Sequence, residues 1–156
     1  ASWKLLERPS NWVLQHHMVT HLKRRVRQGV PSLDGFVDRK AFSRVRTFRH
    51  FDEVYTAPLA GYRDALDYYE KASALPHLKN IQLPTLLIHS LDDPVIPAEP
   101  LQAPEVHSNP SLEVVLTQRG GHVGFMEKGG QGDLDRFWAE NRVIDFFRLF
   151  VSRDNA

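Results

Sequence analysis

Apolar side chains in the first 80 residues follow helical spacing, and no stretch there has the pattern of a strand. Over residues 10–28 they recur every three or four positions, which is the period of an amphipathic helix. Ser10 or Asn11 can cap the start of this helix, and Gly29 and Pro31 predict its end. The apolar positions of this helix are Leu14, Met18, Val19, Leu22 and Val26.

Shorter helices are predicted for the rest of this region. Residues 32–58 have weak periodicity, with one or two amphipathic turns between Phe48 and Tyr55. Residues 61–73 predict a helix with one apolar face. That face consists of Ala65, Leu66, Tyr69 and Ala72.

The pattern changes at residue 81. Residues 84–89 (PTLLIH) form a short apolar, partly β-branched run, which is typical of a buried parallel strand. Residues 112–117 (LEVVLT) predict a second strand, and residues 98–107 between them predict a short helix. Most of the nine glycines fall in residues 119–133, which we therefore expect to be a loop. Residues 134–152 predict a last helix, with a buried side made of Phe137, Trp138, Val143, Ile144, Phe147 and Phe150.

The alternation of strand, helix, strand and helix after residue 81 indicates an α/β fold with a parallel sheet. Two strands leave both outer edges of such a sheet unpaired. We therefore expect a segment that precedes residue 1 to complete the sheet, and the absence of an initiator Met at Ala1 agrees with this expectation.

Composition excludes several classes of chemistry. The 156 residues carry 20 Lys and Arg against 19 Asp and Glu, so a net charge of +1 gives no attraction to nucleic acid. We expect the basic run Lys23–Arg27 to be a solvated helix face. No cysteine is present, which removes disulfides, thiolate nucleophiles and cysteine metal sites. No apolar run approaches the about 18 residues of a membrane span, and we expect a cytoplasmic protein, with membrane attachment through a preceding segment as the alternative.

Two loops carry the candidate chemistry, and each follows a predicted strand. The first is residues 92–97 (DDPVIP), and the second is residues 120–125 (GGHVGF). Ligand sites of open α/β sheets lie beyond the carboxyl ends of the strands. An acid on one loop and a histidine on the next can form a general base, in which the carboxylate accepts the Nδ1 proton and leaves Nε2 to act on a nucleophile. The alternative for each residue alone is a helix cap or a turn hydrogen bond.

Other polar residues are weaker candidates. His17 and His21 are four residues apart on one helix, a spacing found among metal ligands, and His16 lies next to them. No Glu lies between them and no carboxylate completes a site, so we expect no metal and no cofactor. Ser90 follows the first strand without the glycines of a nucleophile elbow, and we expect a turn role for it.

These loops resemble the YheT-like branch of the α/β-hydrolases, which includes membrane-associated relatives described as esterases or phospholipases. The resemblance covers about residues 5–150. It rests on FDEVYTAPLAGYRDALDYYEKASALPHLKNIQLPTLLIHSLDDPVIP, on GGHVGFMEKG and on WAENRVIDFF.

The resemblance implies the C-terminal part of an α/β-hydrolase fold. Residues 1–80 would be a helical cap, and residues 81–156 would be the last two strands with their helices. Asp93 matches the acid of the family's Ser-Asp-His triad in register, and His122 matches its base. Asp92 is the alternative acid and would otherwise brace the turn. None of the nine serines stands in a G-x-S-x-G elbow, so the nucleophile and the oxyanion hole would lie upstream.

Roles for residues near the predicted base stay open. Phe125 and Met126 would line an acyl pocket or pack under the loop. Trp138, Glu140 and Arg142 would be structural, and either Glu140 or Arg142 would brace the histidine loop. The function implied is hydrolysis of short-chain, medium-chain or lipid-like esters, a small-molecule substrate. The alternatives are a non-catalytic binding module and a thioesterase or acyltransferase on the same fold.

Overall fold

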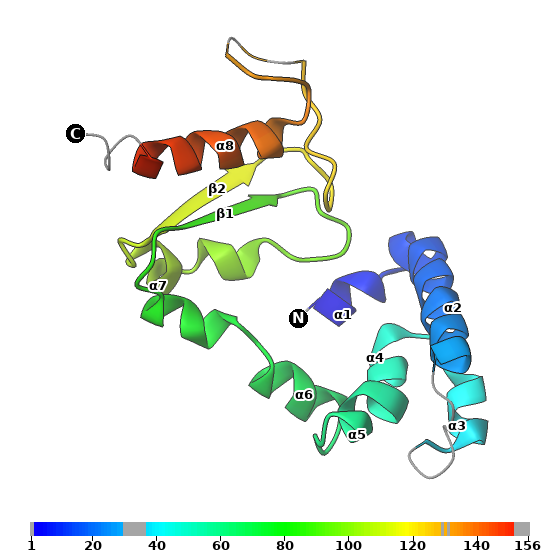
Figure 1. The fold of residues 1–156 in the computed structure, drawn as a ribbon. Coiled ribbons are helices and arrows are strands. Elements are labelled where there is room, and N and C mark those ends of the chain that lie inside the picture. Colours follow the sequence, from blue (N-terminus) through cyan, green and yellow to red (C-terminus); the bar gives the residue numbers. More distant parts are fainter. Residues whose placement is uncertain (1, 30–36, 129, 131, 152–156) are drawn as a thin grey trace. The chain divides into compact units, whose positions relative to one another are not determined.

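The computed structural model describes residues 2–29, 37–128, 130 and 132–151 (Figure 1). The chain divides into two compact units, Ala1–Ala74 and Leu75–Ala156. The labelled helices and strands are α1 (Ser2–Leu6), α2 (Trp12–Gly29), α3 (Arg39–Arg44), α4 (Phe48–Phe51), α5 (Ala57–Leu59), α6 (Ala65–Lys71), β1 (Thr85–Ser90), α7 (Pro104–His107), β2 (Leu112–Thr117) and α8 (Trp138–Val151). The 3-10 helices are Pro9–Asn11, Leu75–Asn80 and Glu99–Gln102, and a π-helix spans Asp52–Thr56.

The first unit is entirely helical among its described residues, as its sequence pattern predicts. Its apolar core brings the inward face of α2 against the segment from α3 to the π-helix. The buried members are Val19, Val26, Phe42, Val45 and Phe51. Helix α2 ends at Gly29 as predicted, whereas Pro31 lies outside the described residues.

Two expectations for the first unit are wrong in part. Arg24, Arg25 and Arg27 are exposed, as expected of a solvated face, but Lys23 is not part of it. Lys23 is 9% exposed, and its Nζ donates to the carbonyls of Ser43 (2.9 Å) and Val45 (3.0 Å). Burial, followed by the charges of Arg46 and Arg27, lowers the pKa of Lys23 below its ordinary value. The helix predicted over 61–73 is shorter, Ala65–Lys71, and its buried side differs from the predicted one. Leu66, which was expected on that side, is 49% exposed, whereas Asp67 is buried.

The second unit is built on a parallel pair of strands. β1 and β2 pair in register from Thr85 opposite Leu112 to Ser90 opposite Thr117. Their carboxyl ends therefore meet at one edge of the sheet, where the loops after Ser90 and Thr117 begin. Helix α7 contacts β2, and α8 packs against β1 on the other side of the pair (Figure 1). Both strands and the α/β alternation are confirmed.

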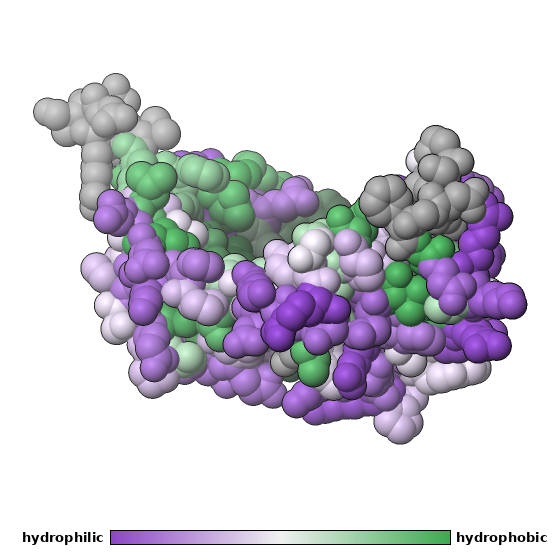
Figure 2. Space-filling view, turned by 90° about the horizontal axis from the view of Figure 1, so that it is seen from below, coloured by the Kyte–Doolittle hydropathy of each residue, from purple (hydrophilic) through white to green (hydrophobic). Residues whose placement is uncertain are grey.

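Helix α8 differs from its prediction in its start and in its buried side. It begins at Trp138 rather than residue 134, because the backbone before it pairs with the preceding loop: Glu127 N donates to Arg136 O (3.0 Å) and Trp138 N donates to Phe125 O (2.9 Å). Three residues of the predicted buried side are exposed: Phe137 (40%), Val143 (40%) and Phe147 (61%). Their apolar side chains extend further around the helix than the face that β1 covers. Figure 2 shows apolar side chains at the surface of this part of the chain.

Among the described residues, no helix has both the length and the hydropathy that a membrane span requires.

Candidate active site at the carboxyl ends of the strands

Asp93 is held in the turn that follows β1. Its side chain is 1% exposed, and one oxygen, Oδ1, accepts hydrogen bonds from the amides of Val95 (2.7 Å) and Ile96 (3.0 Å). This arrangement is the local side-chain-to-backbone turn that aspartate favours. It orients the second oxygen, Oδ2, towards the loop that follows β2.

His122 meets that second oxygen. Its Nδ1 lies 2.9 Å from Asp93 Oδ2, and its side chain is 46% exposed. An ionised carboxylate only accepts, so Nδ1 carries the proton and donates it to Asp93. Burial would raise the pKa of Asp93, but the hydrogen bonds from His122, Ile96 and Val95 together lower it below its ordinary value. The two predicted residues are therefore brought together as an oriented acid–base pair with a partly accessible ring.

Two further residues fix the backbone immediately before His122. Asp92 Oδ1 accepts from the amide of Gly121 (2.9 Å), and Ser90 Oγ donates to the carbonyl of the same residue (2.5 Å). The Gly121 amide is also the main cause that lowers the pKa of Asp92. Gly121 has a φ of +60°, a conformation that glycine adopts without strain. The structure thus places Asp92 as a brace of the histidine loop and Ser90 as a fully buried hydrogen-bond donor.

A second histidine lies on the strand side of Asp93. His89 Nδ1 is 3.9 Å from Asp93 Oδ2, and its Nε2 is 3.1 Å from the carbonyl oxygen of Ile96. Its side chain is 12% exposed. The sequence analysis did not single out this residue. The signal available was its position at the end of β1, four residues before the predicted acid.

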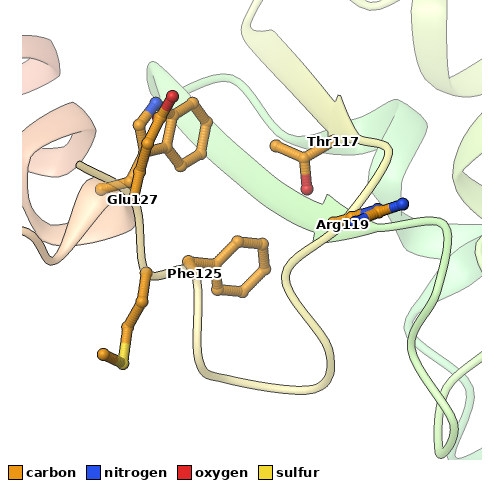
Figure 3. A pocket seen from close by; sticks show the side chains of 6 residues that line it. Thr117, Arg119, Phe125 and Glu127 are labelled. Atoms are coloured by element: carbon orange, nitrogen blue, oxygen red, sulfur yellow. The ribbon is translucent and has the colours of Figure 1, made fainter. Parts of the chain in front are cut away.

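Phe125 packs beneath the histidine loop. A Cβ built on Gly120 would lie 2.6 Å from Cδ1 of the Phe125 ring, so that only glycine leaves room for the aromatic side chain. The ring also stacks on Trp138, with centroids 6.4 Å apart. Phe125 lines an open cavity of about 400 Å³. Figure 3 shows its ring pointing towards Thr117 and Arg119 on the other side of this cavity. His122 is not among the residues that line this cavity, whereas the 59% exposed Met126 is.

Helix α8 holds the segment that directly precedes it through Asn141, a residue that the sequence pattern does not predict as a brace. Asn141 is 4% exposed; its Oδ1 accepts from Leu134 N (3.0 Å), and its Nδ2 donates to Asp135 O (3.0 Å). An asparagine inside a helix is unfavourable by intrinsic propensity, and that was the available signal. Arg142 pairs with Asp133, eight residues after the 120–125 loop, and Glu140 is exposed, so a brace of the histidine loop itself stays a prediction.

The three histidines of α2 do not form a site. The rings of His17 and His21 are 4.4 Å apart. In the part of the chain that the structure describes, no group of three or more His, Cys, Asp or Glu is placed to hold a metal ion.

Curated relatives match most of the length of this chain, at about one-third identity. YheT of Escherichia coli strain K12, an esterase by name, is 34% identical over 148 residues, which are 94% of this chain and 43% of that protein. The human phospholipase ABHD3 is 34% identical over 123 residues, 78% of this chain and 30% of its own length. The chain belongs to the YheT-like α/β-hydrolases. The fold class that the resemblance implied, a part of the α/β-hydrolase fold, is thereby confirmed.

Another α/β-hydrolase relative, the medium-chain fatty acid ethyl ester synthase/esterase 2 of Saccharomyces cerevisiae, is 36% identical over 118 residues, or 75% of this chain and 24% of its own length. The chain therefore spans less than half the length of these curated relatives. No protein-family model matches the chain, and no solved structure matches it.

Proposed function

We propose that this chain supplies the acid and the base of a Ser-Asp-His triad in a carboxylic-ester hydrolase. The observation that carries the proposal is the 2.9 Å contact between His122 Nδ1 and the buried carboxylate of Asp93. The proposal extends to a longer protein, in which a preceding segment contributes the nucleophilic serine, the oxyanion donors and the remaining strands. Residues 1–80 would form its cap.

The chemistry follows from the pair's geometry. With Nδ1–H committed to Asp93, Nε2 of His122 is the basic atom and takes the proton of the serine as its oxygen attacks the ester carbonyl. Asp93 stabilises the imidazolium that results. His122 then returns the proton to the departing alcohol, and an acyl-enzyme remains. In the second half, His122 deprotonates water, which attacks the acyl group. The bond from the acyl carbon to the serine oxygen then breaks, His122 returns the proton to that oxygen, and the acid is released.

The relatives' names support an ester of a small molecule as the substrate. They comprise an esterase, phospholipases and a monoacylglycerol lipase. We include short-chain, medium-chain and lipid-like acyl esters in the proposal. The name of the yeast synthase/esterase favours a second candidate, acyl transfer, in which an alcohol replaces water in the second step. Adding ethanol to the assay and measuring the ratio of ethyl ester to free acid distinguishes the two reactions.

The test uses p-nitrophenyl esters and the protein translated from the reading frame that extends upstream of Ala1. His122→Ala should lower kcat at least about 1,000-fold, as removal of a triad member does. The control is His107→Ala, which removes an exposed histidine from α7 in the same unit and should leave kcat within about two-fold. The 156-residue chain by itself should show no turnover. Turnover by the chain alone that His122→Ala abolishes, or Gly or Ala at the upstream serine position, would overturn the proposal.

A further inference from the structure

We infer that His89 is a positioning residue, which anchors the turn carrying Asp93 to the end of β1 and so aims the carboxylate at His122. This inference rests on the proposed function of the Asp93–His122 pair, whereas the contacts of His89 themselves do not depend on that function. The anchor is the contact of His89 Nε2 with the carbonyl oxygen of Ile96, 3.1 Å away.

The partner of Nε2 fixes the proton on the His89 ring. A carbonyl oxygen only accepts hydrogen bonds, so Nε2 must be the nitrogen that carries the proton. The other ring nitrogen, Nδ1, lies 3.9 Å from Asp93 Oδ2, which is beyond hydrogen-bond distance. His89 therefore leaves Oδ2 to His122, whose Nδ1 is 2.9 Å away.

Ile96 connects this anchor to the acid. Its amide donates to Asp93 Oδ1 (3.0 Å), and its carbonyl accepts from His89. The peptide groups on both sides of Ile96 are thus held, one by the acid and one by the strand. The near end of the turn is tied to β1 by the amide of Asp93, which donates to the carbonyl of Ser90 (3.4 Å). His89 adds a bond from β1 to the far end of the turn, seven residues away.

The 12% exposure of the His89 side chain suits this role. The ring is held through Nε2, and its Nδ1 makes no hydrogen bond to Asp93 Oδ2. For this reason we assign His89 to positioning rather than to catalysis.

The test compares two side chains at position 89, glutamine and asparagine, which carry the same amide group at different distances from the backbone. Glutamine at position 89 extends its terminal group to the place of Nε2 and can donate to Ile96, whereas asparagine reaches only the place of Nδ1. Site-resolved hydrogen exchange of the 156-residue chain follows the amides of Val95 and Ile96. It is read by mass spectrometry at sub-micromolar concentration, below the range in which we expect the chain to associate. His89→Asn should accelerate their exchange about five- to ten-fold, the effect of losing one ordinary hydrogen bond. His89→Gln should keep their exchange within about two-fold of the original chain.

Leu87→Ala is the matched control, because it removes packing from the same strand and the same face without touching the turn. It should accelerate exchange throughout β1, with no excess at Val95 and Ile96. Equal exchange in the Asn and Gln variants, or rescue by Asn alone, would overturn the inference. Hydrogen exchange does not depend on ester hydrolysis. It therefore tests the anchor alone, and the assay of ester hydrolysis tests the proposed triad.

Discussion

Asp93 keeps its charge at a place where burial by itself would favour the neutral acid. Three donors counteract the burial: the ring of His122 and the amides of Ile96 and Val95. Two of them come from the residue's own turn and one from a loop 29 residues later. The acid is therefore ionised before any substrate arrives, and it is ready to stabilise a positive charge on His122.

The lowered pKa of Asp93 predicts how stability depends on pH. The unfolded carboxyl titrates near about 3.9, and the folded one titrates lower, so the folded state is favoured by the ionised form. This contribution is fully present above the unfolded pKa and is lost as the pH falls below about 4 through the folded pKa. Urea midpoints between about pH 2.5 and 6 should fall less steeply for Asp93→Asn than for the original chain. A parallel fall in the two proteins would contradict the assignment; Glu113→Gln, on β2, is the control.

The sequence predicts the pairing of Asp93 with His122 because the two loops follow neighbouring parallel strands. It does not predict their supports. The bonds from Ser90 and Asp92 to Gly121, and from His89 to Ile96, depend on the exact conformation of two irregular loops, which no periodic pattern encodes. Register with the family motif favours Asp93 over Asp92, and the structure places the two carboxylates on different partners.

Elements with a strong period were predicted best. The apolar runs of β1 and β2 and the spacing along α2 specify their elements locally. The predicted start of α8 is wrong because the segment 134–137 pairs with the preceding loop and does not continue the helix. The antiparallel bridge of Met126 and Phe137 is a tertiary contact, which the local sequence pattern does not encode. The prediction of a solvated face fails at Lys23 because its partners, the carbonyls of Ser43 in α3 and of Val45 just after it, are 20 and 22 residues away in sequence.

Lys23 ties α2 to the segment Ser43–Val45, and this contact gives a prediction for the first unit. Lys23→Met preserves the length of the apolar stem but removes one donor from each of the carbonyls of Ser43 and Val45, which keep Arg46 Nη1 at 3.0 Å. We expect the free energy of unfolding of the first unit to fall by about 1–2 kcal/mol. Arg24→Met, at the exposed neighbouring position, should change it by less than about 0.5 kcal/mol. Urea unfolding of both variants measures this difference, and equal destabilisation would contradict the role of Lys23.

At the scale of the whole molecule, the sheet has two strands and two open edges. Each strand pairs on one side only among the described residues, so the backbone amides and carbonyls of the outer sides can pair with another chain. Helix α8 adds exposed apolar area beside the sheet, with Phe147 at 61% and Leu149 at 57%. The proposal of a preceding segment that completes the sheet gives these surfaces a partner.

The open edge predicts that the 156-residue chain by itself associates. Light scattering coupled to size exclusion should show oligomers or aggregates that increase with concentration over the micromolar range. The protein that includes the upstream segment should instead elute as a species of defined size. A monodisperse monomer of the 156-residue chain that unfolds cooperatively would contradict this prediction.

The most direct test of the central claim is a comparison of the two adjacent carboxylates. Asp93→Asn and Asp92→Asn make the same chemical change one residue apart, in the protein that includes the upstream segment. If Asp93 orients His122, Asp93→Asn should lower kcat for p-nitrophenyl ester hydrolysis by about 10,000-fold, as loss of a triad aspartate does. Asp92→Asn should lower it by less than about ten-fold, because Asp92 only braces Gly121. Equal losses, or a larger loss for Asp92→Asn, would contradict the account.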